Sequence, residues 1–212
     1  MLPTRGLPAR TALSGGSRAE RKVPVVTLRA RPFVLIRHGQ TDANRDHLVA
    51  GRTEAQLTQV GRRAAQALSG WEWPADTMLF VSPQQRARET ARLAFPHHSP
   101  VLLEGLRERD WGLLEGRPVS QLLPRDQTPE QGEAWPDMIG RVCAAIAVAQ
   151  DAAAGRLPVC VAHSGVIRAA RHLTGGAADG PSPANTTPYL FSPTPEGWRE
   201  TLLEQKDTRW IA

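Results

Sequence analysis

The sequence lacks the features of a membrane protein, of a disulfide-rich protein and of a P-loop nucleotide-binding protein. No apolar run approaches the roughly 20 residues that are needed to cross a bilayer. The two cysteines, Cys143 and Cys160, show neither CxxC pairing nor the spacing of metal ligands. No glycine stretch continues into Gly-Lys-Ser/Thr, as a Walker-type loop would. We therefore expect no membrane partner, and we expect both cysteines to be reduced core residues of a cytoplasmic protein.

A cluster of Asp, His and Cys residues at metal-ligand spacing is also missing from the sequence, so we expect no metal site and no cofactor. The 212 residues are 41% hydrophobic and 22% charged, which is typical of an ordinary globular protein. A chain of this length favours one domain with a sizeable core. No internal repeat and no linker divides the chain after residue 31.

The basic character of the chain is concentrated at its N-terminus. The pI is about 10.2. Residues 1–31 carry seven basic residues and one acidic residue, whereas the remaining chain carries 19 basic and 20 acidic residues. Because residues 32–212 are almost neutral, a uniformly basic docking face is not indicated, and we expect no nucleic-acid partner.

Residues 1–31 are predicted to be a disordered basic tail. The segment is rich in Arg, Pro, Gly and Ser and lacks hydrophobic periodicity. It also lacks the apolar core of a secretory signal. Its Arg-rich, acid-poor composition resembles an organelle transit peptide, and a translation start further downstream is another alternative. Residues 32–212 are predicted to form one domain.

Short apolar runs alternate with helical patterns in the predicted domain. We expect strands at residues 33–36, 78–81, 101–103 and 159–162, helices at 58–69, 83–95, 135–154 and 166–173, and β-prone segments at 187–192 and 197–204. Thr58 and Ser82 are the expected N-caps of the first two helices. This alternation predicts an α/β fold, a three-layer α/β/α sandwich with a mostly parallel central sheet.

Two of the predicted strands run directly into histidine-containing sequence. Arg37-His38-Gly39 follows the first strand, and His163-Ser164-Gly165 follows the strand at 159–162. Functional residues of such sheets gather beyond the carboxyl ends of the strands. A histidine beside a permanent cation is suited to attack on a phosphoryl group, whose oxygens need positive charge around them. Taken alone, the Arg-His-Gly tripeptide is also compatible with a capping histidine beside a surface arginine.

Five ordered blocks extend this pattern. They are residues 35–61, which contain LIRHGQTDAN, Gly51 and LTQVG, then SPQQRARETA at 82–91, LRERDWGLLEG at 106–116, GEAW at 132–135 and VAHSGVIR at 161–168. Together they closely resemble the histidine phosphatase superfamily, the phosphoglycerate-mutase-like proteins, over about residues 32–171. The resemblance implies that residues 32–212 form a histidine phosphatase domain.

The resemblance also implies catalytic roles for five residues. His38 would become phosphorylated, and Glu108 would donate a proton to the leaving group. Arg37, Arg86 and His163 would hold the phosphoryl oxygens. Attack requires a neutral His38, whereas His163 is more useful as a charged or hydrogen-bonding group, so we expect the two histidines to differ in protonation.

Further substrate contacts are implied for Asn44, for Thr41 and for the backbone N–H of Ser164. Two residues depart from the superfamily pattern, because Gln40 replaces a glutamate found in many members and Ser164 replaces a second glycine. From the residues alone, Glu104 and Asp110 are alternative candidates for the acid.

Only 55 residues separate Glu108 from His163, and they include a long helix. This leaves little room for a large substrate-covering insertion, which favours the compact phosphatases over the glycolytic mutases of the superfamily. We therefore expect metal-independent hydrolysis of a phosphate monoester, with a small phosphorylated metabolite as the partner. The alternatives are a phosphoglycerate-type mutase, a protein-directed phosphatase and, in a different class, a catalytically dead binding protein. The last would bind nucleic acid in a salt-sensitive way and form no phosphohistidine.

Overall fold

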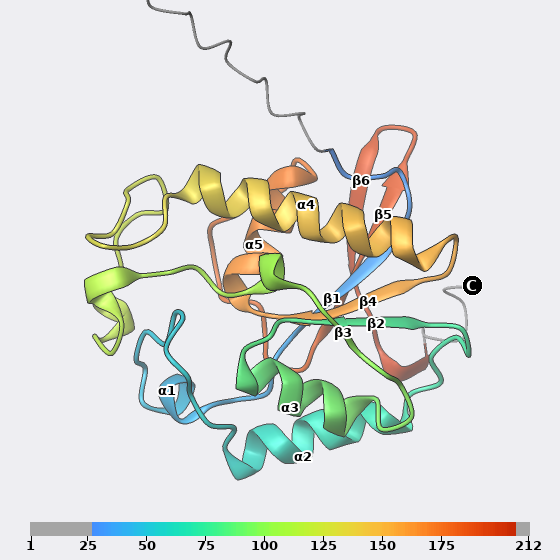
Figure 1. Cartoon of the computed structure of the whole chain (residues 1–212), viewed down its shortest axis with the longest axis horizontal. Helices are drawn as coiled ribbons and strands as arrows, with labels where there is room; N and C mark the ends of the chain where they lie inside the picture. Colours follow the sequence, from blue (N-terminus) through green and yellow to red (C-terminus); the bar gives the residue numbers. More distant parts are fainter. Residues whose placement is uncertain (1–26, 207–212) are drawn as a thin grey trace, which may run out of the picture.

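A six-stranded sheet in the order β3-β2-β4-β1-β5-β6 forms the middle layer of the computed structural model, which describes residues 27–206 (Figure 1). The strands are β1 Phe33–Arg37, β2 Met78–Val81, β3 Val101–Leu102, β4 Pro158–Ala162, β5 Pro188–Thr194 and β6 Gly197–Leu202. β1 to β4 pair in parallel, while β5 runs antiparallel to β1 and β6 antiparallel to β5. The prediction of an α/β fold with a mostly parallel sheet is therefore confirmed.

Helices cover both faces of the sheet. The α-helices are α1 Asp42–Arg45, α2 Gln59–Ala67, α3 Gln85–Ala94, α4 Trp135–Ala153 and α5 Ser164–Leu173, and the short 3-10 turns are η1 Leu68–Gly70, η2 Glu104–Leu106, η3 Gly112–Leu114 and η4 Val119–Gln121. α4 and α5 lie on one face, and α2 and α3 lie on the other (Figure 1).

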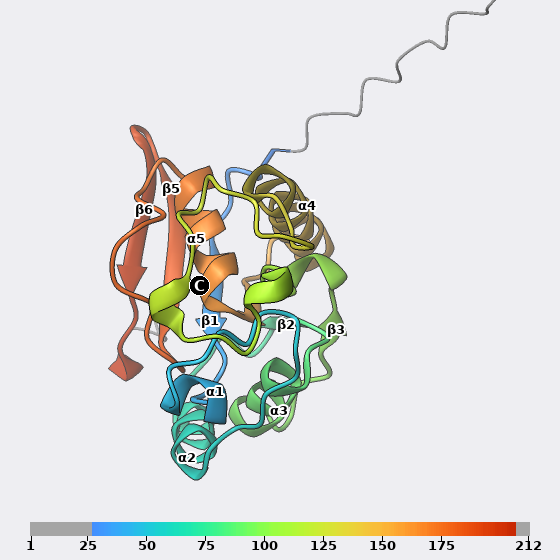
Figure 2. The same cartoon turned by 90° about the vertical axis from the view of Figure 1, so that its left-hand side faces the viewer.

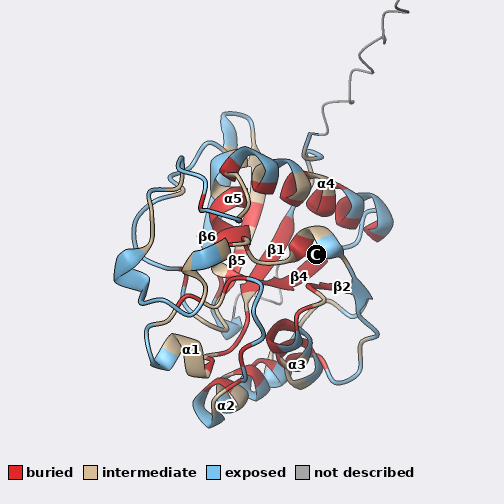
Figure 3. Ribbon diagram, turned by 60° about the vertical axis from the view of Figure 1, so that its left-hand side comes forward, coloured by how far each residue is buried: buried red, intermediate tan, exposed pale blue. Residues whose placement is uncertain are grey.

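β1 shows why these strands are apolar throughout. Successive side chains of a strand point to opposite faces of the sheet. Phe33 and Leu35 pack in the cluster that contains α4 and α5, whereas Val34 and Ile36 pack in the cluster that contains α3. All four side chains are fully buried, and buried residues follow both faces of the sheet in Figure 3. A strand covered on both faces needs an apolar run rather than an alternating one.

The predicted helix caps fare differently in the structure. Thr58 caps α2, because its side chain accepts a hydrogen bond from the Gly61 N–H. The prediction that Ser82 caps the next helix was wrong, since α3 begins at Gln85 with Gln84 as its N-cap residue. The hydroxyl of Ser82 lies instead 2.7 Å from Nε2 of His163. Ser82 therefore contacts a residue of another element instead of capping the helix that follows it.

Residues 1–26 of the predicted tail lie outside the described residues. Residues 28–31, which composition groups with the tail, contact the domain. The Leu28 side chain packs against the core, and the Arg29 N–H donates to Oε1 of Gln150 over 2.9 Å. Arg29 and Arg31 both form ion pairs with Asp151 of α4.

The chain between β3 and α4 lies over the end of the sheet where β1 and β4 finish. It contains η2, η3 and η4, and it passes beside α1 (Figure 2). An isolated bridge between Leu48 and Pro118 joins it to the loop after α1. Among residues 27–206, no helix has the length and apolar character needed to span a membrane.

Candidate active site

His38 and His163 leave the sheet side by side. Arg37 at the end of β1 is in register with Ala162 at the end of β4, so the next residue of each strand emerges at the same place. The His38 N–H continues the ladder by donating to the Ala162 carbonyl over 3.0 Å. The two imidazole ring centroids are 5.2 Å apart, and the residues are only 4% and 0% exposed. The two predicted strand ends therefore meet.

The His38 ring is held in one tautomer. Its Nδ1 lies 2.8 Å from the Gly39 carbonyl oxygen. Because a carbonyl can only accept, we assign the ring hydrogen to Nδ1, which leaves the lone pair of Nε2 unused. Burial lowers the pKa of His38 well below its ordinary value, and the charges of Arg86 and Arg37 lower it further. His38 is thus a neutral imidazole with a free nitrogen, as a nucleophile must be.

The His163 ring is held in the opposite tautomer. Its Nε2 lies 2.7 Å from the Ser82 hydroxyl, which also accepts from the Gln84 N–H over 3.4 Å. We assign the hydroxyl hydrogen to the bond with Nε2, which places the ring hydrogen of His163 on Nδ1. Within the described part of the chain, this buried Nδ1 has no hydrogen-bond partner.

The expectation that the two histidines differ in protonation was wrong. Burial also lowers the pKa of His163 well below its ordinary value, followed by repulsion from Arg86, His38 and Arg37. Both rings are therefore neutral, and the tautomers assigned to them differ instead. His38 presents a lone pair and His163 presents an N–H, which is an arrangement of one attacking and one hydrogen-bonding group.

Arg37 and Arg86 bring positive charge to the two histidines, and neither forms an ion pair with a carboxylate of residues 27–206. Arg37 donates to the Pro183 carbonyl over 2.8 Å, and Arg86 donates to the carbonyls of Thr53 and Gly51 over 3.0 and 2.6 Å. In both side chains Nε is buried and unpaired among residues 27–206. Burial lowers the pKa of both guanidinium groups, which nevertheless stay protonated. One buried and one half-buried cation, each with an unpaired N–H group, favour binding of an anion.

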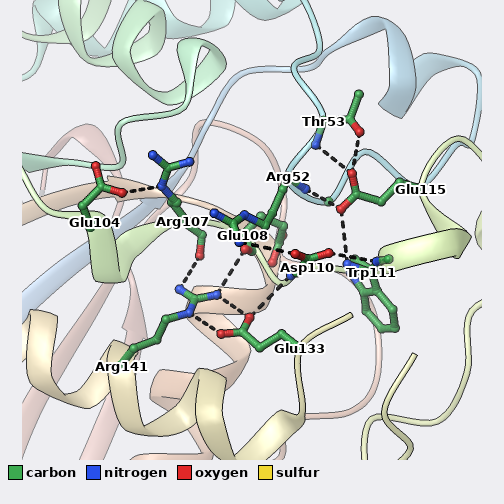
Figure 4. A network of polar contacts seen from close by, with 12 residues as sticks. Arg52, Thr53, Glu104, Arg107, Glu108, Asp110, Trp111, Glu115, Glu133 and Arg141 are labelled. Carbon is green, nitrogen blue, oxygen red and sulfur yellow. Dashed lines mark hydrogen bonds and ion pairs between the residues drawn. The ribbon is translucent and has the colours of Figure 1, made fainter. Parts of the chain in front are cut away.

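Glu108 is held between two backbone amides. Its Oε1 accepts from the Arg109 N–H over 2.8 Å, and its Oε2 accepts from the Gly165 N–H in the first turn of α5 over 3.1 Å. A Cβ atom at Gly165 would lie 2.0 Å from Oε1, so this approach requires glycine. Arg141 supports the loop by donating to the Glu108 carbonyl while it pairs with Glu133 (Figure 4).

The alternative acids lie elsewhere in the same network. Glu104 pairs with Arg107, and Asp110 pairs with Arg52 and accepts from the Gly112 N–H (Figure 4). Neither carboxylate lines the pocket that contains His38, whereas Glu108 does.

A pocket of about 130 Å³ opens above His38. It is lined by Arg37, His38, Asn44, Leu48, Val49, Ala50, Gly51, Arg86, Glu108, Trp111, Val119, Leu122, Arg125, Ser164, Gly165, Arg168 and Ser182. Six of the eight residues proposed from the sequence are in this lining. His163 is buried against His38, and Thr41 is fully buried at the start of α1.

Thr41 acts on the pocket through Asn44. The two residues form a capping box, in which the Thr41 side chain accepts from the Asn44 N–H and Oδ1 of Asn44 accepts from the Thr41 N–H. Asn185 also donates to this Oδ1 over 3.3 Å. Since both contacts use Oδ1, the NH₂ group of Asn44 remains available for a ligand. A direct substrate contact of the buried Thr41 side chain is not favoured by this geometry.

Comparisons with known proteins agree with this geometry. Residues 33–205 match the sequence profile of the histidine phosphatase superfamily (branch 1). The chain belongs to the histidine phosphatase superfamily.

Relatives within the superfamily include phosphatases and mutases. The chain is 28% identical over 143 residues to the uncharacterized phosphatase PhoE of Bacillus subtilis (strain 168), which covers 64% of this chain and 72% of that protein. It is 30% identical over 145 residues to the probable phosphoglycerate mutase GpmB of Klebsiella pneumoniae (strain 342), which covers 61% of this chain and 67% of that protein. The alpha-ribazole phosphatase from Shigella flexneri shares the fold, with a TM-score of 0.69 at 24% identity over 82% of this chain and 96% of that one.

Two positioning residues of this histidine phosphatase were missed from the sequence. Gln84 belongs to the sequence block at residues 82–91. In the structure its Oε1 accepts from the Glu108 N–H over 2.8 Å, and its Nε2 donates to the Gly51 carbonyl. Asn185 donates to the His38 carbonyl over 2.7 Å from the loop before β5. An uncharged amide in a motif gives no local sign of its partner, and Asn185 belongs to no block. A group of three or more His, Cys, Asp or Glu residues suited to hold a metal was sought across residues 27–206 and none was found.

Proposed function

We propose that this protein hydrolyses phosphate monoesters of small metabolites through a phosphohistidine at His38. The observation that carries the proposal is the neutral His38 ring, whose Nε2 is free and whose neighbours are two arginines, Arg37 and Arg86, each with a buried Nε that makes no hydrogen bond. The Nδ1 hydrogen bond to the Gly39 carbonyl aims the ring and also stabilises the positive charge that appears on it during attack.

In the first step, Nε2 of His38 attacks phosphorus. The N–P bond forms while the bond to the leaving oxygen breaks, and its electron pair remains on that oxygen. Glu108 supplies the proton that neutralises the leaving alkoxide. The guanidinium groups of Arg37 and Arg86 and the Nδ1–H of His163 hold the phosphoryl oxygens, with the Asn44 amide and the Ser164 N–H as further donors.

In the second step, water attacks phosphorus of the phosphohistidine. Glu108 is now a carboxylate and takes a proton from the water. The N–P bond breaks, its electron pair returns to Nε2, and inorganic phosphate is released. The two backbone amides that hold Glu108 keep the same carboxyl group in place for both steps.

Metal independence is part of the proposal. A metal ion in phosphoryl transfer neutralises charge on the phosphoryl oxygens. Arg37 and Arg86 line the pocket and supply that charge here.

A small phosphorylated substrate suits the size of the pocket. Pockets for drug-sized ligands typically measure ~300–1,000 Å³, whereas this one measures about 130 Å³. This supports a small molecule rather than a nucleic acid or a protein segment as the partner. A phosphoglycerate-type mutase is the second candidate, because GpmB is among the relatives.

We also propose a cytoplasmic location, which is supported by two buried free cysteines and by a Cys160 pKa that burial raises to about 12.

The test is a screen of phosphate monoesters with and without excess EDTA, scored by release of inorganic phosphate. A quench without acid, followed by mass analysis, should locate phosphate on His38. His38→Ala should abolish both signals, and His97→Ala, an exposed control, should retain both. Loss of activity in EDTA that added metal restores would contradict metal independence. Phosphate on His163 would exchange the roles of the two rings, and transfer to a second substrate molecule would favour the mutase.

A further inference from the structure

Three arginines gather at the outer part of the pocket, away from the two histidines. They are Arg109, Arg125 and Arg168, and the last two line the pocket itself. The guanidinium groups of Arg109 and Arg125 both lie over the ring of Trp135, at 5.8 and 5.7 Å from its centroid. Burial lowers the pKa of Arg109 and of Arg168, and the nearby charge of Arg125 lowers both further.

The side chains of Arg109 and Arg168 are held in place by hydrogen bonds to backbone carbonyls. Arg168 is 4% exposed and donates to the carbonyls of Ala178 and Gly180 over 2.7 and 2.8 Å. Arg109 is 1% exposed and donates to the carbonyls of Glu133 and Gln127 over 3.0 and 2.9 Å. Carbonyls satisfy N–H groups but do not neutralise charge. The cluster therefore keeps a net positive charge.

Arg125 is the arginine of the cluster that both lines the pocket and has terminal nitrogens left to bind a ligand. Its ion pair is with Asp179, whose side chain is 87% exposed, over 3.3 Å. Its Nε faces Oδ1 of Asp179 in this ion pair without forming a hydrogen bond, and its two terminal nitrogens make no hydrogen bond to any residue in the range 27–206. An exposed carboxylate neutralises a nearby cation only weakly, because water screens the pair.

The lining of the pocket carries more positive charge than a bound phosphate monoester would neutralise. Its lining contains four arginines, Arg37, Arg86, Arg125 and Arg168, and one carboxylate, Glu108. A phosphate monoester brings at most two negative charges. One cation of the lining therefore lacks a counterpart when only a phosphoryl group is bound. Arg37 and Arg86 are assigned to that phosphoryl group and Arg168 is held by two carbonyls. The remaining cation is Arg125, whose ion pair is with the exposed Asp179.

We propose that Arg125 forms a second anion subsite, which receives a carboxylate or a second phosphate of the same substrate molecule. The proposal rests on the proposed function and narrows its substrate class to metabolites with two anionic groups. Arg168 and Arg109 are positioning residues in this subsite. They hold the segments around Gly180 and Gln127 that flank Arg125, and their charge strengthens its attraction for an anion.

The test compares substrates that differ in one anionic group. 3-Phosphoglycerate and glycerol 3-phosphate differ by a carboxylate, and 1,3-propanediol bisphosphate and 3-hydroxypropyl phosphate differ by a phosphate. The native protein should prefer the doubly anionic member of at least one pair in kcat/KM by roughly 10–100-fold, as expected for hydrogen bonds to charged groups. The pair that shows the preference identifies the anion.

Arg125→Gln should remove this preference by raising KM for the doubly anionic substrate, while values for the singly anionic substrate stay within about twofold. Arg125→Lys should restore part of the preference, because it keeps the charge without the planar fork. Arg88→Gln is the matched control. It removes the same charge from an exposed position on α3, so the preference should remain.

Equal losses on both members of a pair in Arg125→Gln would overturn the subsite, and so would the absence of any preference in the native protein. Binding to His38→Ala separates this proposal from the proposed function. In that background 3-phosphoglycerate or the bisphosphate should raise the melting temperature more than its singly anionic counterpart, and adding Arg125→Gln should remove the difference. A thermal preference without turnover would contradict the proposed function alone. No thermal preference would contradict the subsite.

Discussion

The pocket has a floor and a rim that are built in different ways. The floor consists of Arg37, His38, Arg86 and His163, which stand at the ends of strands or at the start of a helix next to the sheet. The rim consists of residues 111–125 and 176–186, which carry short 3-10 turns but no strand and no α-helix. Hydrogen bonds between neighbouring strands position the floor residues, whereas hydrogen bonds from side chains to backbone carbonyls position the rim residues.

This difference separates the chemistry from its selectivity. The floor holds the groups that act on any phosphoryl group, and the rim holds Arg125, which we propose to act on the rest of the substrate. Glu108 connects the two, because it lies in the chain that leads to the rim while its Oε2 accepts from the first turn of α5. Changes in the floor should affect every substrate, and changes in the rim should affect only some.

The largest effect is expected from Glu108→Gln, which tests the residue that links the floor of the pocket to its rim. Glutamine keeps the shape but cannot deliver a proton, so hydrolysis of alkyl phosphates should fall by ~10²–10⁴-fold. The initial burst with p-nitrophenyl phosphate should change far less, because p-nitrophenolate leaves without a proton. Glu104→Gln, on the same loop with a side chain that is 75% exposed, should behave like the native protein. An equal loss in the burst would count against Glu108 as the acid.

A smaller effect is expected from Ser82→Ala, which tests the floor by itself. Loss of the hydroxyl removes the bond that holds the hydrogen of His163 on Nδ1, and one neutral hydrogen bond corresponds to roughly a tenfold loss of activity or less. Nitrogen chemical shifts of the His163 ring should report a mixture of tautomers. Ser99→Ala, at an exposed position, should change neither readout. If activity falls while the ring keeps its tautomer, Ser82 has a different role.

The last prediction concerns the pH dependence of the free energy of unfolding, which should depend on the two histidines of the floor and not on the rim, and which needs no substrate to measure. The folded-state pKa values of His38 and His163 lie below the unfolded value, so the unfolded chain binds more protons in acid. The free energy of unfolding should therefore be highest above about pH 6.5 and fall as the pH falls below it, by up to about 1.4 kcal/mol per pH unit for each histidine.

Urea unfolding at several pH values measures this slope. His163→Gln should reduce it by the share of one histidine, and Arg125→Gln should leave it unchanged. A stability that stays constant or rises between pH 6.5 and pH 5 would contradict the burial of two neutral rings.

The sequence allowed Arg37, His38 and His163 of the floor to be predicted because they follow apolar runs, whereas the role of Arg86 was implied by the resemblance to the superfamily. The run before His38 and the run before His163 each predicted a buried parallel strand, and parallel strands place their carboxyl ends together. The rim carried no such signal. Arg125 lies in a segment without hydrophobic periodicity. Its proposed role in binding an anion depends on the charges of Arg109 and Arg168 and on the carbonyl of Gln127, which come together only in the folded chain.

Protonation was the other property that the sequence could not supply. The Ser82 hydroxyl was expected to cap a helix, and its contact with Nε2 of His163 decides which tautomer that ring adopts. Burial then keeps both rings neutral. Neither the depth of a side chain nor the direction of a hydroxyl group is encoded by the residue types on either side of it.

The order of the strands also governs when the floor can exist during synthesis of the chain. β1 and β4 are neighbours in the sheet, yet β2, β3 and α4 are all made between them. Until β4 has left the ribosome, the backbone of β1 has no parallel partner and β2 has only β3 beside it. Such long-range pairings form slowly and leave strand edges exposed in the meantime. A chain that terminates before β4 therefore carries His38 without its opposing histidine, and it presents unpaired strands that are prone to aggregate.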